Sequence, residues 1–147
     1  MFEHLIGKQS QKVINEVERG AVKQFAEAIG DPHPIYVDRS FGEKSNYKTN
    51  IAPPTFPQTF DYGNIKALKL PKAGLIHGEQ SFEYQRPITV GETLQCYSEI
   101  YGYKEKHTKS GKLGFLSIQN IGEDQSGIEV FHTKSVIIIT EAVRGGS

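Results

Sequence analysis

The sequence contains a single cysteine, Cys96, and no excess of either charge. One cysteine forms no internal disulfide and no cysteine-based zinc site, so a disulfide scaffold and a zinc finger are excluded. The 17 basic and 17 acidic residues give a net charge of zero with histidine neutral. This balance offers no support for nucleic-acid binding, which normally requires a basic excess.

Long apolar runs are also missing. The longest, Val136–Ile139, is far below the roughly 18 residues of a membrane-spanning helix, and its β-branched residues predict a buried strand. The first residues lack the basic and then apolar stretches of a signal peptide. We therefore expect a cytoplasmic protein without membrane contact. Its 147 residues and 16.4 kDa fit one domain, expected at residues 1–143, followed by a flexible tail at 144–147.

Two helices are expected in the first half of the chain. From Arg19 to Ile29, apolar residues recur at positions 22, 25, 26 and 29, which is the spacing of one helical face, and Gly30 ends the helix. A second helix is expected from Pro54 to Leu68, because proline is favoured in a first helical turn. Phe56, Phe60 and Ile65 would lie along one side of it.

The second half is rich in β-branched and aromatic residues separated by polar turns. Strands are expected at 76–86, 93–106, 113–121 and 128–140. In the second of these, Leu94, Cys96, Ser98, Ile100 and Gly102 would share one face. Helices followed by a run of strands predict an α+β fold with an antiparallel sheet, packed on the helix at 54–68.

The segment Gly30–Asp38 is the most unusual stretch of the chain. It places two carboxylates, an imidazole and a phenol within nine residues, and two prolines restrict its backbone. A stiff polar loop after a helix suits a catalytic group. The same Asp-Pro-His-Pro pattern is also an ordinary turn in which Asp31 caps the backbone.

Other common chemistries lack their motifs. The five histidines form no His-x-His or His-x-x-x-His pair, so no metal site is expected. There is no Gly-x-Ser-x-Gly elbow of an α/β-hydrolase and no glycine-rich phosphate loop. Cys96 lies within an alternating strand pattern, which predicts a buried and inert thiol.

Four motifs together resemble the MaoC-like dehydratase family in its N-terminal-domain type. They read FAEAIGDPHPIY at 25–36, IAPPTF at 51–56, HGEQSFEY at 77–84 and VGETL at 90–94. This family includes the (R)-specific enoyl-CoA hydratases and 3-hydroxyacyl-ACP dehydratase subunits. The likeness extends over about residues 5–140, with the motifs in the family's order.

The resemblance implies a hot-dog fold, in which an antiparallel sheet wraps a long central helix and pairs edge to edge with a second such domain. It implies that an acyl thioester of coenzyme A or acyl carrier protein binds at the interface of a homodimer or heterodimer. The implied reaction is the reversible hydration of a trans-2-enoyl thioester to a (3R)-hydroxyacyl thioester, without a cofactor.

The resemblance also indicates candidate catalytic residues. In active members an Asp and a His five residues apart activate the attacking water. The Asp position falls on Asp31, but the His position falls on Tyr36, and a phenol with a pKa of about 10 is a poor general base at neutral pH. His33, where the family commonly has Asn, is the third candidate.

The start of the expected second helix differs as well. Active hydratases tend to have Ala-His-Gly where this chain has Ala52-Pro53-Pro54, and prolines carry no N–H group. The backbone N–H groups of Thr55 and Phe56 remain as candidate oxyanion donors. The candidate substrate-binding residues are Pro54, Thr55, Phe56, Phe60, Tyr62, His77 and Arg86, of which Arg86 would meet coenzyme A phosphates.

Three functional hypotheses follow. Tyr36 and the two prolines match the substrate-holding, non-catalytic subunits of heterodimeric dehydratases. A self-sufficient homodimeric hydratase is the second hypothesis, with Asp31 activating water with the help of His33 or Tyr36. The third is an acyl-thioester-binding protein that performs no chemistry.

Overall fold

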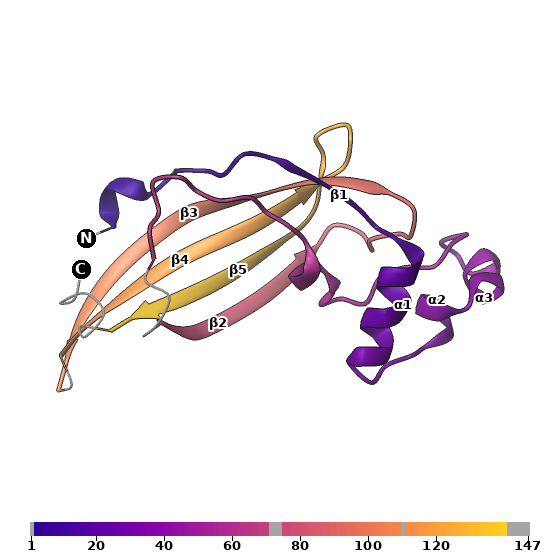
Figure 1. The fold of residues 1–147 in the computed structure, drawn as a ribbon, viewed down its shortest axis with the longest axis horizontal. Helices are drawn as coiled ribbons and strands as arrows, with labels where there is room; N and C mark the ends of the chain where they lie inside the picture. The colour runs from indigo at the N-terminus through magenta and orange to yellow at the C-terminus, as the bar shows by residue number, and fades with distance from the viewer. Residues whose placement is uncertain (1, 71–74, 110, 141–147) are drawn as a thin grey trace.

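Five strands form one antiparallel sheet in this computed structural model, which describes residues 2–70, 75–109 and 111–140 (Figure 1). The expected boundary at 143 and the tail at 144–147 lie outside the described residues. Across the sheet the strand order is β1-β3-β4-β5-β2. Their bounds are Val13–Glu16, Leu75–Tyr84, Thr93–Thr108, Gly111–Glu123 and Glu129–Ile139 for β1 to β5.

The four long strands confirm the expected α+β class, and β1 was not expected. Strand β1 pairs with the start of β3, and β2 pairs antiparallel with β5, so β1 and β2 are the two edges of the sheet. A register shift between Ile100 and Gly102 in β3 changes the predicted alternation. Beyond this bulge Tyr103, rather than Gly102, joins Ile100 in the core, and Tyr103 is 8% exposed.

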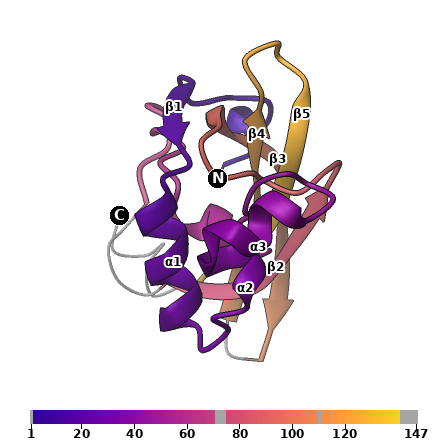
Figure 2. The same ribbon diagram turned by 90° about the vertical axis from the view of Figure 1, so that its right-hand side faces the viewer.

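Three short helices gather beyond one end of the strands (Figure 1), and they lie in front of the sheet when the molecule is viewed from that end (Figure 2). Helix α1, Arg19–Ala28, confirms the first expected helix and buries Val22 and Ala26 completely. It is followed by α2, Pro34–Val37, and α3, Arg39–Lys44. Two single 3-10 turns, η1 at Glu3–Leu5 and η2 at Phe56–Thr59, complete the helical elements of the described chain.

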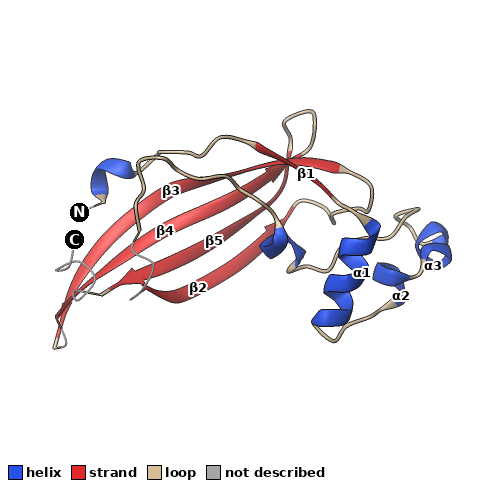
Figure 3. Cartoon of the chain, in the orientation of Figure 1, coloured by secondary structure: helices blue, strands red, loops and turns tan. Residues whose placement is uncertain are grey.

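The expected helix from Pro54 to Leu68 is wrong beyond its first turn. Only η2 is helical, and the chain then continues as coil toward β2 (Figure 3). Gly63 has a φ of 72°, in the left-handed region that ends helices. Asn15 holds the backbone N–H and C=O of Asp61 at 3.0 and 2.8 Å, and Ser10 Oγ donates to the Tyr62 carbonyl at 2.6 Å. These bonds to the N-terminal segment replace the helical ones.

The inner face of the sheet carries two separate apolar clusters. The first apolar cluster lies at the helical end and includes Val22, Phe56 and Phe131. The second apolar cluster lies toward the other end and includes Ile65, Ile100 and Leu116, with Leu68 and Leu70 packed against it. The coil after η2 therefore covers part of the sheet face that a long helix was expected to cover.

Candidate active site

An open hollow of about 410 Å³ lies where α2 and the Ile51–Pro54 segment meet the end of β2. Its wall is mostly apolar. It is lined by Tyr36, Ile51, Ala52, Pro54, Tyr84, Gln85, Arg86, Pro87 and Ile88. Of the sequence-predicted site residues, Tyr36, Pro54 and Arg86 thus come together from three distant parts of the chain.

Asp31 and Tyr36 are brought close to each other by the turn after α1. The backbone N–H of Asp31 donates to the Ala26 carbonyl at 2.9 Å, and Gly30 takes the positive φ of 75° that the turn needs. Burial, followed by the negative charge of Asp31, raises the pKa of Tyr36 above its usual range. Asp31 itself is exposed and is not among the residues that line the hollow.

His33 caps α2 and lies beside Tyr36 without lining the same hollow. Its Nδ1 accepts a 3.0 Å hydrogen bond from the Ile35 N–H and so caps α2, while Pro34 occupies the first helical position. The imidazole packs edge-on against the rings of Tyr36 and Phe41, with centroids 6.0 and 5.8 Å away. It borders a second hollow on the α3 side rather than the one that Tyr36 lines.

Asn50 holds this loop against the sheet, and sequence reasoning missed it. The side chain is fully buried, and Nδ2 donates to the carbonyls of Ile35 and Asp38, both at 2.8 Å. Its Oδ1 accepts from Arg19 Nη1 at 2.5 Å, and its backbone carbonyl accepts from the Val90 N–H at 2.9 Å. Through its side chain and its backbone carbonyl, this one residue ties α1, α2 and the Pro87–Val90 loop together.

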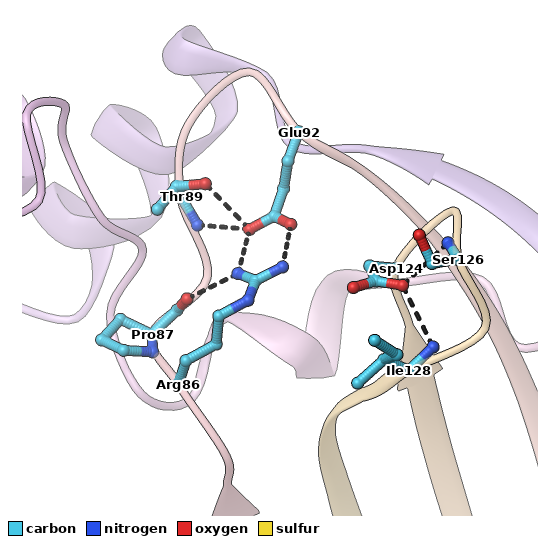
Figure 4. Close-up of polar contacts among 7 residues, drawn as sticks. All are labelled: Arg86, Pro87, Thr89, Glu92, Asp124, Ser126 and Ile128. Carbon is cyan, nitrogen blue, oxygen red and sulfur yellow. Dashed lines mark hydrogen bonds and ion pairs between the residues drawn. The ribbon is translucent and has the colours of Figure 1, made fainter.

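Arg86 is bound by a carboxylate of its own chain (Figure 4). Its guanidinium makes a two-point contact with Glu92 at 2.7 and 2.9 Å, and Nη1 also donates to the Pro87 carbonyl at 3.0 Å. Glu92 in turn accepts from the N–H and hydroxyl of Thr89 at 2.7 and 2.9 Å. The hydrogen bonds that Arg86 donates to the Glu92 carboxylate raise the pKa of Arg86. The pair closes the loop that forms one wall of the hollow.

Tyr84 is a lining residue that the sequence did not single out. Its hydroxyl donates to the Pro54 carbonyl, which fixes Pro54 at the rim of the hollow. Burial raises the pKa of Tyr84, so its phenol stays protonated as a donor. Its ring lies 6.0 Å from that of Phe131 and so connects the hollow to the first apolar cluster.

The remaining predicted residues lie deeper or farther away. Phe56 is 2% exposed, and its N–H donates to the Pro53 carbonyl at 2.9 Å, which leaves Thr55 as the candidate oxyanion donor. Phe60 and Tyr62 pack against the first apolar cluster, and the Tyr62 hydroxyl donates to the Pro57 carbonyl at 2.6 Å. His77 is exposed at a register shift of the edge strand β2, outside the lining.

Two further expectations concern metals and Cys96. Across residues 2–70, 75–109 and 111–140, no group of three His, Cys, Asp or Glu side chains is placed to hold a metal ion. Cys96 is completely buried, and burial raises the pKa of its thiol to about 12. The thiol therefore stays protonated at neutral pH, in agreement with the expected inert cysteine. No helix of the described chain is long and apolar enough to cross a membrane.

Residues 4–133 match the model of the family described as FAS1-like, dehydratase domain region. The chain belongs to this dehydratase family. A curated relative, a UPF0336 protein of Thermobifida fusca, is 37% identical over 95 residues. That match takes in 60% of this chain and 62% of the relative, so the chain spans less than two thirds of that relative's length.

Solved structures of the dehydratase type share the fold. The HadBC (3R-hydroxyacyl-ACP dehydratase) complex from Mycobacterium tuberculosis contains a chain with a TM-score of 0.77 and 19% identity, covering 91% of this chain and 96% of that one. The MaoC-like dehydratase from Rhodospirillum rubrum gives 0.69 at 19% identity, with 91% of both chains covered. The expected hot-dog fold and the MaoC-like resemblance are confirmed. In this member of the dehydratase family, coil replaces most of the expected central helix.

Proposed function

We propose that this chain is the acyl-binding subunit of a heteromeric dehydratase that acts on (3R)-hydroxyacyl and trans-2-enoyl thioesters. A second hot-dog subunit would supply the catalytic histidine. The observation that carries the proposal is Tyr36, which faces the hollow where a general base is expected. Its raised pKa keeps the phenol protonated at neutral pH, so Tyr36 can orient a ligand by hydrogen bonding but cannot take a proton from water.

The lining of the hollow supports a role without proton transfer. All its lining residues lie in the described part of the chain, and they include no histidine and no carboxylate. The Nδ1 atom of His33 accepts the hydrogen bond that caps α2. Hydration needs a base for water and a proton source for the adjacent carbon, and this half-site presents neither in its wall.

The start of η2 also departs from what enolate stabilisation needs. A helix N-terminus stabilises negative charge through several unpaired N–H groups and its dipole. Here Pro53 and Pro54 have no N–H, the Phe56 N–H donates to the Pro53 carbonyl, and η2 itself is only four residues long. The developing thioester enolate would therefore find little stabilisation from this chain, which favours a partner that carries this function.

What this chain offers is an apolar surface for the acyl group. The hollow opens between Tyr36, Tyr84 and Ile88, and the Arg86 charge in its wall is neutralised by Glu92. Because two nitrogens of Arg86 donate to Glu92, we assign Arg86 first to shaping the wall of the hollow. Contact with a coenzyme A phosphate is its second proposed role.

Strand β2 is the edge at which we propose that the partner subunit pairs. It is ten residues long, has β5 on one side only, and most of its side chains are exposed. Unpaired edges of this length are normally covered in native proteins. The solved HadBC dehydratase is described as a complex, which supports a partner subunit for this chain.

A homodimeric hydratase is the second candidate, favoured by the closeness of Asp31 to Tyr36. Co-expression separates the two. The chain is produced alone and together with a second short hot-dog protein that carries an intact Asp and His pair, and crotonyl-CoA hydration is assayed. Activity only in the co-purified pair, retained in an Asp31→Asn variant of this chain, supports the proposal. Full activity of the chain alone contradicts it, and ligand binding without turnover in either sample indicates a pure acyl-thioester-binding protein.

A further inference from the structure

A polar row crosses the inner face of the sheet between the two apolar clusters. Ser98 on β3, Asn120 on β4 and Thr133 on β5 are successive strand partners, and Ser98 Oγ donates to Asn120 Oδ1 at 2.5 Å. Phe131 of the first cluster lies two residues before Thr133, and Ile100 of the second lies two residues after Ser98. A domain normally has one contiguous core, so a polar interruption at its centre needs a reason.

Thr133 is the unusual member of this row. The residue is 2% exposed, and within the described ranges its Oγ1 is a buried side-chain oxygen without a hydrogen-bond partner. A buried hydroxyl that bonds to nothing destabilises the folded state, so each such group needs an explanation, and a bound ligand or ordered water is one.

The row lies between two hollows. Tyr84, in the wall of the candidate active site, is the strand partner of Phe131, and Thr133 follows about 7 Å farther along β5. At the other end of the row, Ser98 lines a hollow of about 280 Å³ beneath the coil that includes Ile65 and Leu68. A chain that extends from the first hollow along the sheet toward the second would therefore cross the row.

The layer above the inner face at this point is coil rather than helix. Phe60 belongs to it, with its ring 6.0 Å from that of Phe131 and 6.4 Å from that of Tyr62. Aromatic side chains on coil can shift to admit a ligand without breaking helical hydrogen bonds. A fully apolar chain would leave the Thr133 hydroxyl unpaired, whereas a chain with an oxygen at this depth would satisfy it.

We propose that Ser98, Asn120 and Thr133 form a binding site for an oxygen atom carried partway along the acyl chain, as a hydroxyl or keto group. This inference rests on the proposed function as an acyl-binding subunit. The Thr133 hydroxyl donates to the ligand oxygen, and the Ser98–Asn120 bond holds the neighbouring amide in place. The site would make the protein selective for oxygenated acyl thioesters.

The test uses medium-chain acyl thioesters whose single hydroxyl group is moved stepwise along the chain, loaded on coenzyme A and on acyl carrier protein. Binding is measured by calorimetry with the protein in the assembly in which it purifies. One positional isomer is expected to bind about tenfold more tightly than the unsubstituted chain. Thr133→Val, which keeps the shape, should abolish this preference without lowering the melting temperature, and Thr133→Ser should retain it.

Two results would overturn the site. Equal binding of every isomer and the unsubstituted chain would show that the polar row does not bind a ligand oxygen. An unchanged preference in Thr133→Val, with a lowered melting temperature, would show that Thr133 holds structural water instead. If no acyl thioester binds, on coenzyme A or on acyl carrier protein, the proposed acyl-binding function is contradicted, and this inference is contradicted with it.

Discussion

Arg19 Nη1 donates a 2.5 Å hydrogen bond to the side-chain oxygen of Asn50, and this contact joins helix α1 to the segment between α3 and η2. The other half of the Asn50 amide donates to the carbonyls of Ile35 and Asp38. Both halves of one fully buried side chain therefore make hydrogen bonds, although Arg19 and Ile35 are only partly buried and Asp38 is exposed.

Asn50→Ala is expected to destabilise the protein by about 3 kcal/mol, because it removes the amide hydrogen bonds to Arg19, Ile35 and Asp38 and leaves a cavity at a fully buried position. Urea denaturation measures the free energy of unfolding. Asn46→Ala, at an exposed position in the same loop, is the control and should change it by less than about 0.5 kcal/mol. Equal effects of the two variants would mean that the Asn50 bonds do not hold the loop.

A substitution at Gly42 tests the packing around Asn50, because Gly42 lies directly against the Asn50 amide. A Cβ at this position would lie 2.6 Å from Asn50 Nδ2 and 2.7 Å from the Asn50 backbone nitrogen, so Gly42→Ala must displace the buried amide. We expect a loss of about 2 kcal/mol. The matched variant Gly20→Ala in α1 meets open space and should stabilise by about 0.5 to 1 kcal/mol, because alanine favours the helix. Melting temperatures that move in the same direction for both would contradict this packing.

The Arg86–Glu92 pair predicts a stability that depends on pH. Burial opposes ionisation of Glu92, but the hydrogen bonds from Arg86 and Thr89 outweigh it and lower the pKa of this carboxyl. A carboxyl with a lowered folded-state pKa stabilises above its unfolded pKa of about 4.3, and this contribution is lost as the pH falls through the folded value.

Glu92→Gln should therefore cost about 1 kcal/mol at pH 7 and progressively less below about pH 4. Chemical denaturation of both proteins across this range gives the difference directly. Glu43→Gln, from the exposed pair of Glu43 with Arg39, serves as the control and should show little pH-dependent difference. A constant gap between wild type and Glu92→Gln down to pH 3 is the contrary result.

The influence of Asp31 on Tyr36 can be measured by titration. Because the carboxylate disfavours the phenolate, Asp31→Asn should lower the pKa of Tyr36 while burial keeps it above the usual value. Nuclear magnetic resonance of ring-labelled tyrosine, assigned with Tyr36→Phe, follows this one side chain. An unchanged Tyr36 titration would place Asp31 too far away for any shared role.

Local patterns predicted much of this fold. The spacing of Val22, Phe25 and Ala26 was sufficient for α1, since a surface helix buries one face. The long strands followed from alternation and turns to within a few residues. The bulge after Ile100 could not be predicted, because a register shift depends on how β3 meets β4 and leaves no mark in a single strand.

The segment after Pro54 shows where local reasoning fails. Its apolar spacing resembles a helix, but Asn15 and Ser10, more than 40 residues earlier, bind its backbone and hold it extended. The capping of α2 by His33 had a local signal, since Pro34 follows it directly. The Asn50 contacts had none, because their partners come from α1, α2 and a loop near residue 90.

The central claim is that this chain binds the acyl thioester but does not catalyse its hydration by itself. The most direct measurement is the turnover of crotonyl-CoA by the purified chain without any partner, compared with its Asp31→Asn variant. The account predicts no turnover above background in either sample. Turnover at the rate of an ordinary hydratase that disappears in Asp31→Asn would contradict it.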